Sequence, residues 1–477
     1  MAPPGGQAKD DDELQRLGYA PELTRTLDLL ASFSIAFSYI SPVVGVYTLF
    51  GYGLSTGGPA YVWSLPLVVL GQLLVVLVFS ELAVTYPLAG ALYQWARRLI
   101  GPRFGWFVGW IYGWALVVTI AAIDLGAAPY LTSLLGMEVT RTSTVLLAAA
   151  LLVLHTIINY EGVRGTAFVT KAGLATEVVA TLVIAGALLW SGELQPLSTL
   201  FSRETPSGVA GLPGMLAACL AMAWVFFGFE SAADVAEEVV DPARRIPRAM
   251  ILSLLGAALV TFVLVAALVL SAPDLAAAAA DPARAIPMIL EAHLGASALR
   301  GLLILLMFAF LSCAGAAQAA AARLLYSYAR DGMLPGSGWL RRVSTAHKVP
   351  ANATLFAAAL AALVIGLSYV DLGQVNVNAL VVSYAVVGIY LSFQLIVAAR
   401  LVAGLRGWRP RTGPGLFSLG RFGVPVAALG LAYGLAMIVN LCWPRPHDSL
   451  AAWLTLFSAV AIVAPGVVLV LLRKPPP

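Results

Sequence analysis

Charged residues are scarce in this chain. Only 11% of its 477 residues are Asp, Glu, Lys or Arg, whereas 60% are hydrophobic and the mean hydropathy is +0.89. Water-soluble proteins carry about 25% charged and about 45–50% apolar residues. The composition therefore excludes a water-soluble globule and predicts a protein of the lipid bilayer, with little chain left for a separate soluble domain.

Cysteine and histidine are also rare, with three and four residues. The three cysteines lie far apart in apolar runs, so the sequence predicts neither a disulfide framework nor a metal site. The spacings typical of metal ligands and the pairing of a nucleophile with a base are missing, so an enzyme is disfavoured and no cofactor is expected. A net charge of +4, dispersed along the chain, argues against nucleic acid binding.

The first 28 residues are polar and lack the basic start, short apolar core and cleavage site of a secretory signal. We therefore expect the first apolar segment to be retained and to serve as the insertion signal. A bilayer span takes about 20 apolar residues, and twelve such segments follow. They run about 29–53, 61–84, 105–132, 142–160, 165–190, 211–239, 247–271, 298–329, 350–368, 374–400, 422–443 and 449–472.

Basic residues are distributed unevenly between the loops that connect these segments. If the N-terminus is cytoplasmic, 23 of the 28 Lys and Arg residues fall on the cytoplasmic side. This asymmetry favours a multi-pass protein of the cell membrane with both termini in the cytoplasm. The five residues on the outer side are Arg141, Arg203, Arg284, Arg300 and Arg445.

Two of the predicted spans contain residues that interrupt a helix. In the first span, the run SYISPVVGVY places Ser41, Pro42 and Gly45 near the bilayer middle, where proline removes a backbone donor. In the sixth span, the run AWVFFGFESAAD places Gly228 and Glu230 at membrane depth. These spans are five apart, so matching breaks indicate two five-helix repeats of opposite orientation with a binding site between them. Simple kinks are the alternative, since Pro and Gly are common in membrane helices.

The sequence thus predicts an all-α integral membrane protein with a five-plus-five inverted repeat and two additional C-terminal helices, twelve transmembrane helices in total. The predicted divisions are a cytoplasmic N-terminal tail (1–28), the first five-helix repeat (29–190), the second, inverted repeat (211–403), helices 11 and 12 (422–472) and a cytoplasmic tail (473–477).

An ionisable side chain inside a span costs at least about 2.5 kcal/mol, so each one needs a reason. Basic residues are absent from the middle of every predicted span, which suits a site for cationic groups or protons. The candidates for proton coupling or gating are Asp124, Glu177, Glu230 and Asp234.

Most of these candidates also have a purely structural interpretation. Glu230 directly follows the break in helix 6, where it binds a proton or only caps the second half-helix. Glu177 either takes part in coupling or forms an interhelical hydrogen bond. Asp124 is expected near the hydrated outer end of helix 3, in an unremarkable role. His155, the one histidine predicted to be buried, is expected to make a structural hydrogen bond.

The cytoplasmic end of helix 6 carries a cluster of acidic residues. Asp234, Glu237 and Glu238 lie a few positions before Arg244 and Arg245 in the sequence. Opposite charges at this spacing predict salt bridges that hold an inner gate closed.

A break in helix 1 also creates a site for a ligand with two charges. The free N–H groups that open the second half-helix, at the positive end of its dipole, are a receiver for a carboxylate. The carbonyls that end the first halves of helices 1 and 6 accept an ammonium group, so a zwitterionic amino acid satisfies both. Trp224 is a candidate lid or cation–π partner, with simple packing as the alternative. The predicted substrate-binding residues are Ser41, Pro42, Val43, Val44, Gly45, Val46, Thr119, Trp224, Phe227 and Gly228.

Several long motifs run in order along nearly the whole chain. They include FSYISPVVGVYTLF in the first span, ELAVTYPLAGALYQWARRLIGPRFGWFVGW across the second and third, INYEGVRGTA after the fourth, GFESAADVAEEVVDPARRIPRA in the sixth and RLLYSYARDGMLP after the eighth. Together they resemble the amino acid–polyamine–organocation superfamily of permeases, most closely the amino acid/choline/GABA permease branch. The resemblance implies a leucine-transporter-like fold with the substrate between broken helices 1 and 6.

The resemblance also implies roles for individual residues. In related permeases with a GxESA stretch, the acidic residue takes part in proton-linked gating and an aromatic residue six positions earlier stacks over the substrate. These positions match Glu230 and Trp224. The chain departs from its relatives in helix 1, where SPVVG replaces a glycine-rich break, and in helix 5, where Glu177 replaces a lysine. Ser312 is a weak candidate for a sodium-type site between helices 1 and 8.

We therefore expect a secondary active transporter that takes up an amino acid or related amine together with a proton by alternating access. GABA, choline and polyamines are candidate substrates, and sodium stays open as the coupling ion. The alternatives are an amino acid or amine exchanger and a non-transporting nutrient sensor on the same fold. The expected partners are the small-molecule substrate and the lipid bilayer, with no nucleic acid and no obligatory protein partner.

Overall fold

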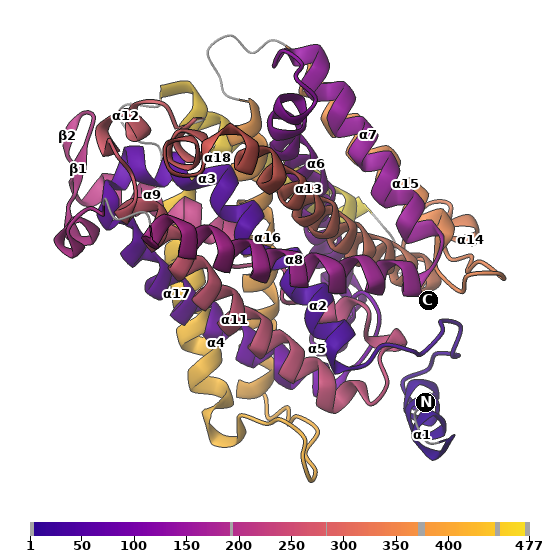
Figure 1. The fold of residues 1–477 in the computed structure, drawn as a ribbon. Coiled ribbons are helices and arrows are strands. Elements are labelled where there is room, and N and C mark those ends of the chain that lie inside the picture. Colours follow the sequence, from indigo (N-terminus) through magenta and orange to yellow (C-terminus); the bar gives the residue numbers. More distant parts are fainter. Residues whose placement is uncertain (1–3, 191–193, 283, 371–376, 444–448, 473–477) are drawn as a thin grey trace.

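The computed structural model describes residues 4–190, 194–282, 284–370, 377–443 and 449–472. Nearly all secondary structure in this part of the chain is helical (Figure 1). The exceptions include β1 (Glu204–Thr205) and β2 (Gly208–Val209), which pair antiparallel in a short hairpin. The predicted tail 473–477 and the predicted outer residue Arg445 lie outside the described residues.

The helices fall into two sets along the chain. The first set comprises α1 (Pro4–Arg16), α2 (Leu29–Ile40), α3 (Pro42–Gly57), η1 (Pro59–Trp63), α4 (Ser64–Thr85), α5 (Ala91–Leu99), α6 (Pro102–Leu134), α7 (Arg141–Tyr160), α8 (Val163–Trp190) and η2 (Leu197–Phe201). The second set comprises α9 (Leu212–Val225), α10 (Ser231–Asp234), η3 (Ala236–Glu238), α11 (Pro242–Leu270), α12 (Leu275–Ala280), α13 (Ala285–Arg330), α14 (Ser337–Leu340), α15 (Ala351–Leu367), α16 (Val377–Leu405), η4 (Gly420–Phe422), α17 (Gly423–Cys442) and α18 (Ser449–Leu472).

Nine helical segments of the described chain are long and apolar enough to cross a membrane. The other three of the twelve predicted spans correspond to shorter apolar helices, namely α9, α15 and the C-terminal part of α18 (Ala459–Leu471). The short length of α9 follows from the break in helix 6. The chain is therefore an all-α membrane protein, and the boundaries of its two repeats stay predictions.

Helix 1 is broken where the sequence predicts it. The first half, α2, ends at Ile40, and the second half, α3, begins at Pro42. Between them Ser41 has a left-handed backbone with φ 41° and ψ 84°. Pro42 has no N–H to continue the hydrogen-bond ladder, and proline favours the first turn of a new helix. The Ser41 hydroxyl then accepts the N–H of Val44 at 3.3 Å and caps that turn.

Helix 6 is broken more widely. The first half, α9, ends at Val225, and the next helical turn, α10, begins at Ser231 and spans four residues. Gly228 has φ 112°, a conformation that favours glycine. A Cβ added at Gly228 would lie 2.8 Å from the backbone N of Ile40, so the two breaks lie back to back. The matching breaks therefore meet in the folded chain.

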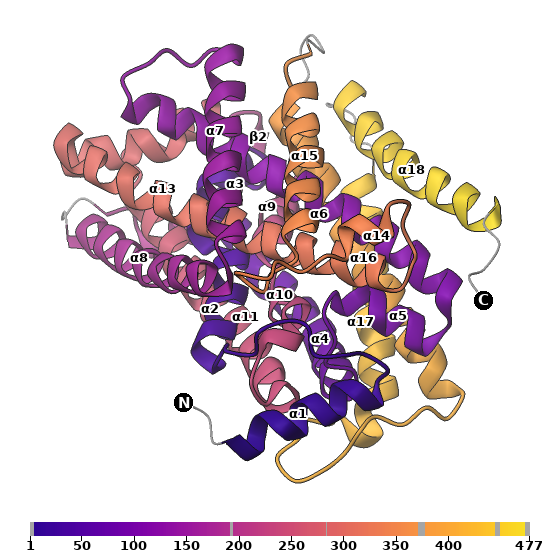
Figure 2. The same cartoon turned by 90° about the vertical axis from the view of Figure 1, so that its right-hand side faces the viewer.

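The remaining helices surround the two broken ones. α6 packs against α13 and α16, and α8 packs against α2 and α13. α1 lies at one end of the molecule, and the β hairpin with α12 lies at the other (Figure 1). We call the end that carries α1, α5, η3 and the C-terminal end of α13 the α1 face, and the opposite end the hairpin face. α18 lies at the periphery (Figure 2).

Candidate functional site

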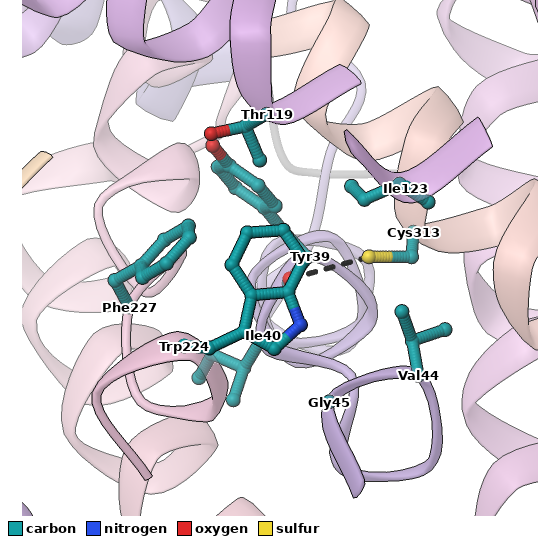
Figure 3. A pocket seen from close by; sticks show the side chains of 9 residues that line it. All are labelled: Tyr39, Ile40, Val44, Gly45, Thr119, Ile123, Trp224, Phe227 and Cys313. Atoms are coloured by element: carbon teal, nitrogen blue, oxygen red, sulfur yellow. Dashed lines mark hydrogen bonds between the residues drawn. The ribbon is translucent and has the colours of Figure 1, made fainter. Parts of the chain in front are cut away.

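A narrow pocket lies between the two breaks. The space between its atoms, part of which is open to solvent, is about 200 Å³. None of the nine side chains that line it is charged. They are Tyr39, Ile40, Val44, Gly45, Thr119, Ile123, Trp224, Phe227 and Cys313 (Figure 3).

Five of the ten predicted substrate-binding residues line this pocket, namely Val44, Gly45, Thr119, Trp224 and Phe227. The other five, Ser41, Pro42, Val43, Val46 and Gly228, are buried in or beside the breaks and are not among the lining residues. The predicted residues thus fall into two groups. One group lines the pocket, and the other belongs to the backbone of the breaks that shapes it.

Four lining residues were missed by sequence reasoning. Tyr39 and Ile40 directly precede the break in helix 1, so their position next to Ser41 was an available signal. Ile123 and Cys313 belong to α6 and α13 and are brought to the pocket by tertiary packing. No local pattern in the sequence marks these two.

Aromatic rings form one wall of the pocket. The ring of Phe227 lies edge-on to Trp224, with centroids 5.5 Å apart, and edge-on to Tyr39, with centroids 5.9 Å apart. The indole of Trp224 crosses the middle of the pocket, and the hydroxyl of Tyr39 points toward Thr119 (Figure 3). Trp224 therefore both packs in this cluster and lines the pocket with its ring.

The break in helix 1 already has most of its donors engaged. The N–H of Val44 bonds to the Ser41 hydroxyl, the N–H of Gly45 bonds to the Ser41 carbonyl at 2.9 Å, and Pro42 has no N–H. The Ser41 hydroxyl in turn donates to the Glu177 carboxylate at 3.0 Å. Glu177, in the middle of α8, therefore lies at the N-terminus of α3, where a substrate carboxylate was expected.

Glu177 is thus the acid of the helix 1 break. It makes an interhelical hydrogen bond to Ser41, as one of the two interpretations predicts, and also interacts with the backbone N–H of Val43. Its second oxygen, Oε2, is buried with no hydrogen-bond partner. Anions are stabilised at a helix N-terminus by the free N–H groups and the dipole, which accounts for the placement of this buried carboxyl group.

The break in helix 6 has its own acid. Glu230 accepts the backbone N–H of Gly228 at 2.9 Å, and no side chain caps the N-terminus of α10. Its carboxyl group therefore supports the unwound backbone and does not simply cap the second half-helix. The hydroxyl of Tyr112 lies 3.3 Å from Glu230 and 2.7 Å from Asp234, so one phenol connects two buried acids. Sequence reasoning missed Tyr112, because nothing local marks its contacts.

Asp124 lies in a different place from the one predicted. It is 1% exposed, not hydrated at the outer end of helix 3, and its Oδ2 lies 3.2 Å from Nε2 of His155. His155 also bonds Gln318 on α13, which bears out its structural hydrogen bond. The expectation for Asp124 was wrong because α7 and α13 cover this part of α6.

The acidic cluster after helix 6 forms ion pairs, but with other arginines than predicted. Arg323 binds Glu238 through Nε at 2.7 Å and Nη2 at 3.0 Å, and Arg330 binds Glu237 with two bonds of 2.8 Å. Both arginines lie on α13. The predicted pairing with Arg244 and Arg245 was wrong, since Arg323 and Arg330 of α13 occupy the carboxylates of Glu238 and Glu237.

Asp234 and Arg244 both lie outside these pairs. Asp234 accepts the hydroxyl of Tyr112, and its Oδ1 is buried with no partner. Arg244 is exposed and lies 3.4 Å from Asp241 of its own helix start. The ion pairs at the α1 face are therefore contacts between η3 and α13.

The segment that leads into helix 1 reinforces this closure. The N–H groups of Thr26 and Leu27 both bond to the Glu238 carbonyl at 2.9 Å. Tyr19 donates to Asp331 at 2.9 Å and accepts from Arg97 at 2.9 Å. Burial, followed by the Asp331 carboxylate, raises the pKa of Tyr19. The N-terminal segment thus ties both broken helices to α5 and α13.

Ser312 stays a candidate without a tested role. Its hydroxyl is buried with no hydrogen-bond partner, and it lies next to Gly173 of α8. Within the described residues, the His, Cys, Asp and Glu side chains form no group of three or more that could hold a metal ion.

A family model described as amino acid permease matches residues 27–468. An uncharacterized amino-acid permease of Schizosaccharomyces pombe is 25% identical over 480 residues, which cover 96% of this chain and 84% of that protein. The GABA-specific permease of Saccharomyces cerevisiae is 25% identical over 495 residues, which cover 96% and 82%.

The fold is similar to that of a solved transporter. The crystal structure of MhsT in complex with L-phenylalanine superposes with a TM-score of 0.60 at 16% identity, over 92% of this chain and 99% of that one. Together with the broken helices and the membrane-length segments, this defines a multi-pass membrane transporter of leucine-transporter-like fold. The chain belongs to the amino acid permease family, within the amino acid–polyamine–organocation superfamily, and is an amino acid transporter.

Proposed function

We propose that this permease takes up an amino acid or related amine across the plasma membrane together with a proton, by alternating access. Both termini then lie in the cytoplasm, and the α1 face is the cytoplasmic face. GABA is a candidate substrate, as the printed name of one relative suggests.

The observation that carries this proposal is an uncharged pocket with a buried acid behind each break. Glu177 bonds Ser41 behind helix 1, and Glu230 bonds Gly228 behind helix 6. Both side chains are fully buried. An ionisable group inside a membrane protein is costly and marks proton or substrate pathways. Two acids attached to the backbone that forms the pocket link a change of protonation to the shape of that pocket.

The pocket favours anchoring through an ammonium group. Trp224, Phe227 and Tyr39 offer ring faces to a cation. A substrate carboxylate, in contrast, meets a helix 1 N-terminus whose Val44 and Gly45 donors are already bonded to Ser41. The carboxylate of an amino acid therefore binds there only when the Ser41–Glu177 contact rearranges.

Alternating access requires closures that open in turn. At the α1 face, the ion pairs Arg323–Glu238 and Arg330–Glu237 hold η3 against α13. Toward the hairpin face, the backbone of Pro282 packs directly on Gly51 of α3. In the proposed cycle, each set of contacts parts while the other stays formed.

Uptake into proteoliposomes tests the proposal. We expect an inward proton gradient to drive accumulation of at least one compound among neutral amino acids, GABA, choline and polyamines, while an inward sodium gradient at equal pH does not. Absence of all uptake under the proton gradient would contradict symport. Counterflow without net uptake would then indicate an exchanger, and binding without either would indicate a sensor.

A further inference from the structure

A second group of buried polar side chains lies outside the pocket, between α6, α7, α13 and the start of α8. Its centre is His155, whose two ring nitrogens contact Asp124 of α6 and Gln318 of α13. The side chains of this network are buried, with exposed fractions between 0% and 8%. Its members are Asp124, His155, Thr156, Asn159, Thr166 and Gln318.

The direction of the hydrogen bonds in this network is determined by two backbone carbonyls. The Thr156 hydroxyl donates its hydrogen to the Leu152 carbonyl at 2.6 Å, so it accepts from the amide nitrogen of Gln318 at 2.7 Å. The amide nitrogen of Asn159 faces the Gly315 carbonyl at 2.9 Å. A carbonyl oxygen only accepts, so the amide orientations of Gln318 and Asn159 follow from their partners.

The protonation of His155 follows from that direction. The amide oxygen Oε1 of Gln318 accepts from Asn159 at 2.8 Å and lies 3.0 Å from Nδ1 of His155. Because Oε1 of Gln318 can only accept a hydrogen bond, Nδ1 of His155 must donate one and therefore carries a hydrogen. A neutral imidazole has one N–H. Nε2 is then an unprotonated acceptor unless a further proton is present.

The contact between His155 and Asp124 therefore requires one more proton. Nε2 lies 3.2 Å from Oδ2 of Asp124, and without a proton the two atoms would be facing acceptors in a buried place. Leaving such groups unpaired is unfavourable, and more so when one of them is charged. With the proton, the pair is either imidazolium with carboxylate or imidazole with carboxylic acid. Its net charge is zero in both forms.

The pair lies directly behind the pocket. Ile123, the neighbour of Asp124, lines the pocket, as does Cys313. The titratable groups that face the pair are Cys313, which interacts electrostatically with Asp124, and beyond it Glu177 on α8. Two further helices pack against this group: α8, which contacts α7 and α13 and carries Glu177, and α15, whose residues Ala351–Leu367 include no titratable side chain.

We propose that Asp124 and His155 form a proton-binding site, separate from the acids of the two breaks, which holds the coupled proton of the transport cycle. Release of the proton to water leaves a carboxylate beside a neutral imidazole, with net charge −1, and uptake restores the neutral pair. The role of this site in transport rests on the proposed proton-coupled function. The existence of the site does not.

Asp124→Asn is the sharpest test, because its amide nitrogen can donate to Nε2 and keep the hydrogen bond without a removable proton. One proton per substrate across one pH unit drives up to about tenfold accumulation at zero membrane potential. We expect the wild type to approach this ratio and Asp124→Asn to fall to about onefold, with counterflow retained. His155→Gln removes the imidazole but leaves the Asp124 carboxyl group, so it should lower the ratio less than Asp124→Asn; it provides the test if Asp124→Asn does not fold.

Thr166→Val is the matched control. It removes the hydrogen bond from Thr166 to Asn159, at the end of the network farthest from the pair, and leaves Asp124 and His155 unchanged. It should keep the wild-type ratio. If Asp124→Asn and His155→Gln both keep that ratio, or if Thr166→Val loses it equally, the assignment of the proton to this pair is wrong.

Calorimetry separates this failure from that of the proposed function. Substrate binding measured in two buffers with different ionisation enthalpies counts the protons that binding takes up or releases. We expect a proton count that depends on pH in the wild type and vanishes in Asp124→Asn. If the wild type shows no proton-driven uptake but still shows this difference, symport fails and the site stands. An unchanged proton count in Asp124→Asn would overturn the site.

Discussion

The two breaks satisfy their backbone groups in different ways. In helix 1, Ser41 caps α3 with its hydroxyl, and the associated acid, Glu177, comes from α8. In helix 6, Gly228 adopts a backbone conformation that favours glycine. The associated acid, Glu230, follows two residues later and accepts the N–H of Gly228. Helix 6 thus carries its own acid, whereas helix 1 depends on another helix for one.

This difference assigns different consequences to the two acids. A change at Glu230 acts directly on the unwound backbone beside the pocket. A change at Glu177 acts on the contact between α8 and the break in helix 1, and on the charge at the N-terminus of α3. The comparison therefore predicts that the helix 6 break tolerates substitution less well.

The largest effect is expected for Gly228→Ala. The new Cβ would lie 2.8 Å from the Ile40 nitrogen and from the Tyr39 carbonyl carbon, at φ 112°. Left-handed strain and overpacking together should lower the free energy of unfolding by about 2–5 kcal/mol. Thermal unfolding in detergent measures this. In the control Gly113→Ala, the Cβ meets Leu324 at 3.5 Å, so stability should be maintained. Equal stability of the two variants would contradict the back-to-back breaks.

Glu230→Gln should have the next largest effect. The amide oxygen can still accept the Gly228 N–H, but the charge-assisted part of that bond is lost. Since a hydrogen bond to a charged group contributes about 1.5–3 kcal/mol, we expect the initial uptake rate to fall about 10- to 100-fold, with the protein still folded. A rate within twofold of the wild type would show that transport does not depend on the charge of Glu230.

Trp224→Ala tests the contribution of the aromatic wall. A desolvated cation–π contact is worth about 2 kcal/mol, so the dissociation constant of the best amine-bearing ligand should rise about 30-fold. Trp224→Phe should lose less. Ligand-induced thermal shifts measure both, and an unchanged response in Trp224→Ala would place the ligand elsewhere.

Glu177→Gln should produce a smaller and selective effect. Removing a carboxylate from a helix N-terminus changes the local free energy for anions by about 0.3–1 kcal/mol, and by up to about 2 kcal/mol when buried. We therefore expect the affinity for an amino acid to increase about 2- to 30-fold relative to the amine that lacks its carboxylate. Competition for uptake measures this ratio. If it stays constant, Glu177 does not occupy the carboxylate position.

The smallest effect is expected for a change at Tyr19, in the N-terminal segment that connects both broken helices at the α1 face. The raised pKa of Tyr19 favours its neutral form in the folded chain, so its contribution is complete below about pH 10, the ordinary value, and is lost only as pH rises through the higher folded value. Proteolysis of residues 4–27 should therefore accelerate in strongly alkaline buffer. Tyr19→Phe should accelerate it several-fold already at pH 7, and should abolish the alkaline step that this phenol causes.

Local rules explain which features could be predicted from the sequence. Pro42 and Gly228 break helices by their own chemistry, so the two breaks and the fold were accessible from single residues and their spacing. The partners of the buried acids were not, because Arg330 and Glu237 are 93 residues apart and meet only through packing. Nearby Arg244 suggested the wrong partner for the same reason. Burial of Asp124 likewise depends on helices that approach it from elsewhere in the chain.

The most direct test of the substrate site uses its own thiol. Cys313 lines the pocket, 3.4 Å from the Tyr39 carbonyl, whereas Cys442 lies at the end of α17 and serves as an internal control. The rate at which a small methanethiosulfonate reagent labels each cysteine is measured by peptide mass spectrometry, with and without saturating substrate. We expect substrate to slow the labelling of Cys313 and to leave the labelling rate of Cys442 unchanged. Labelling of Cys313 at the same rate with substrate bound would contradict a site between the two breaks.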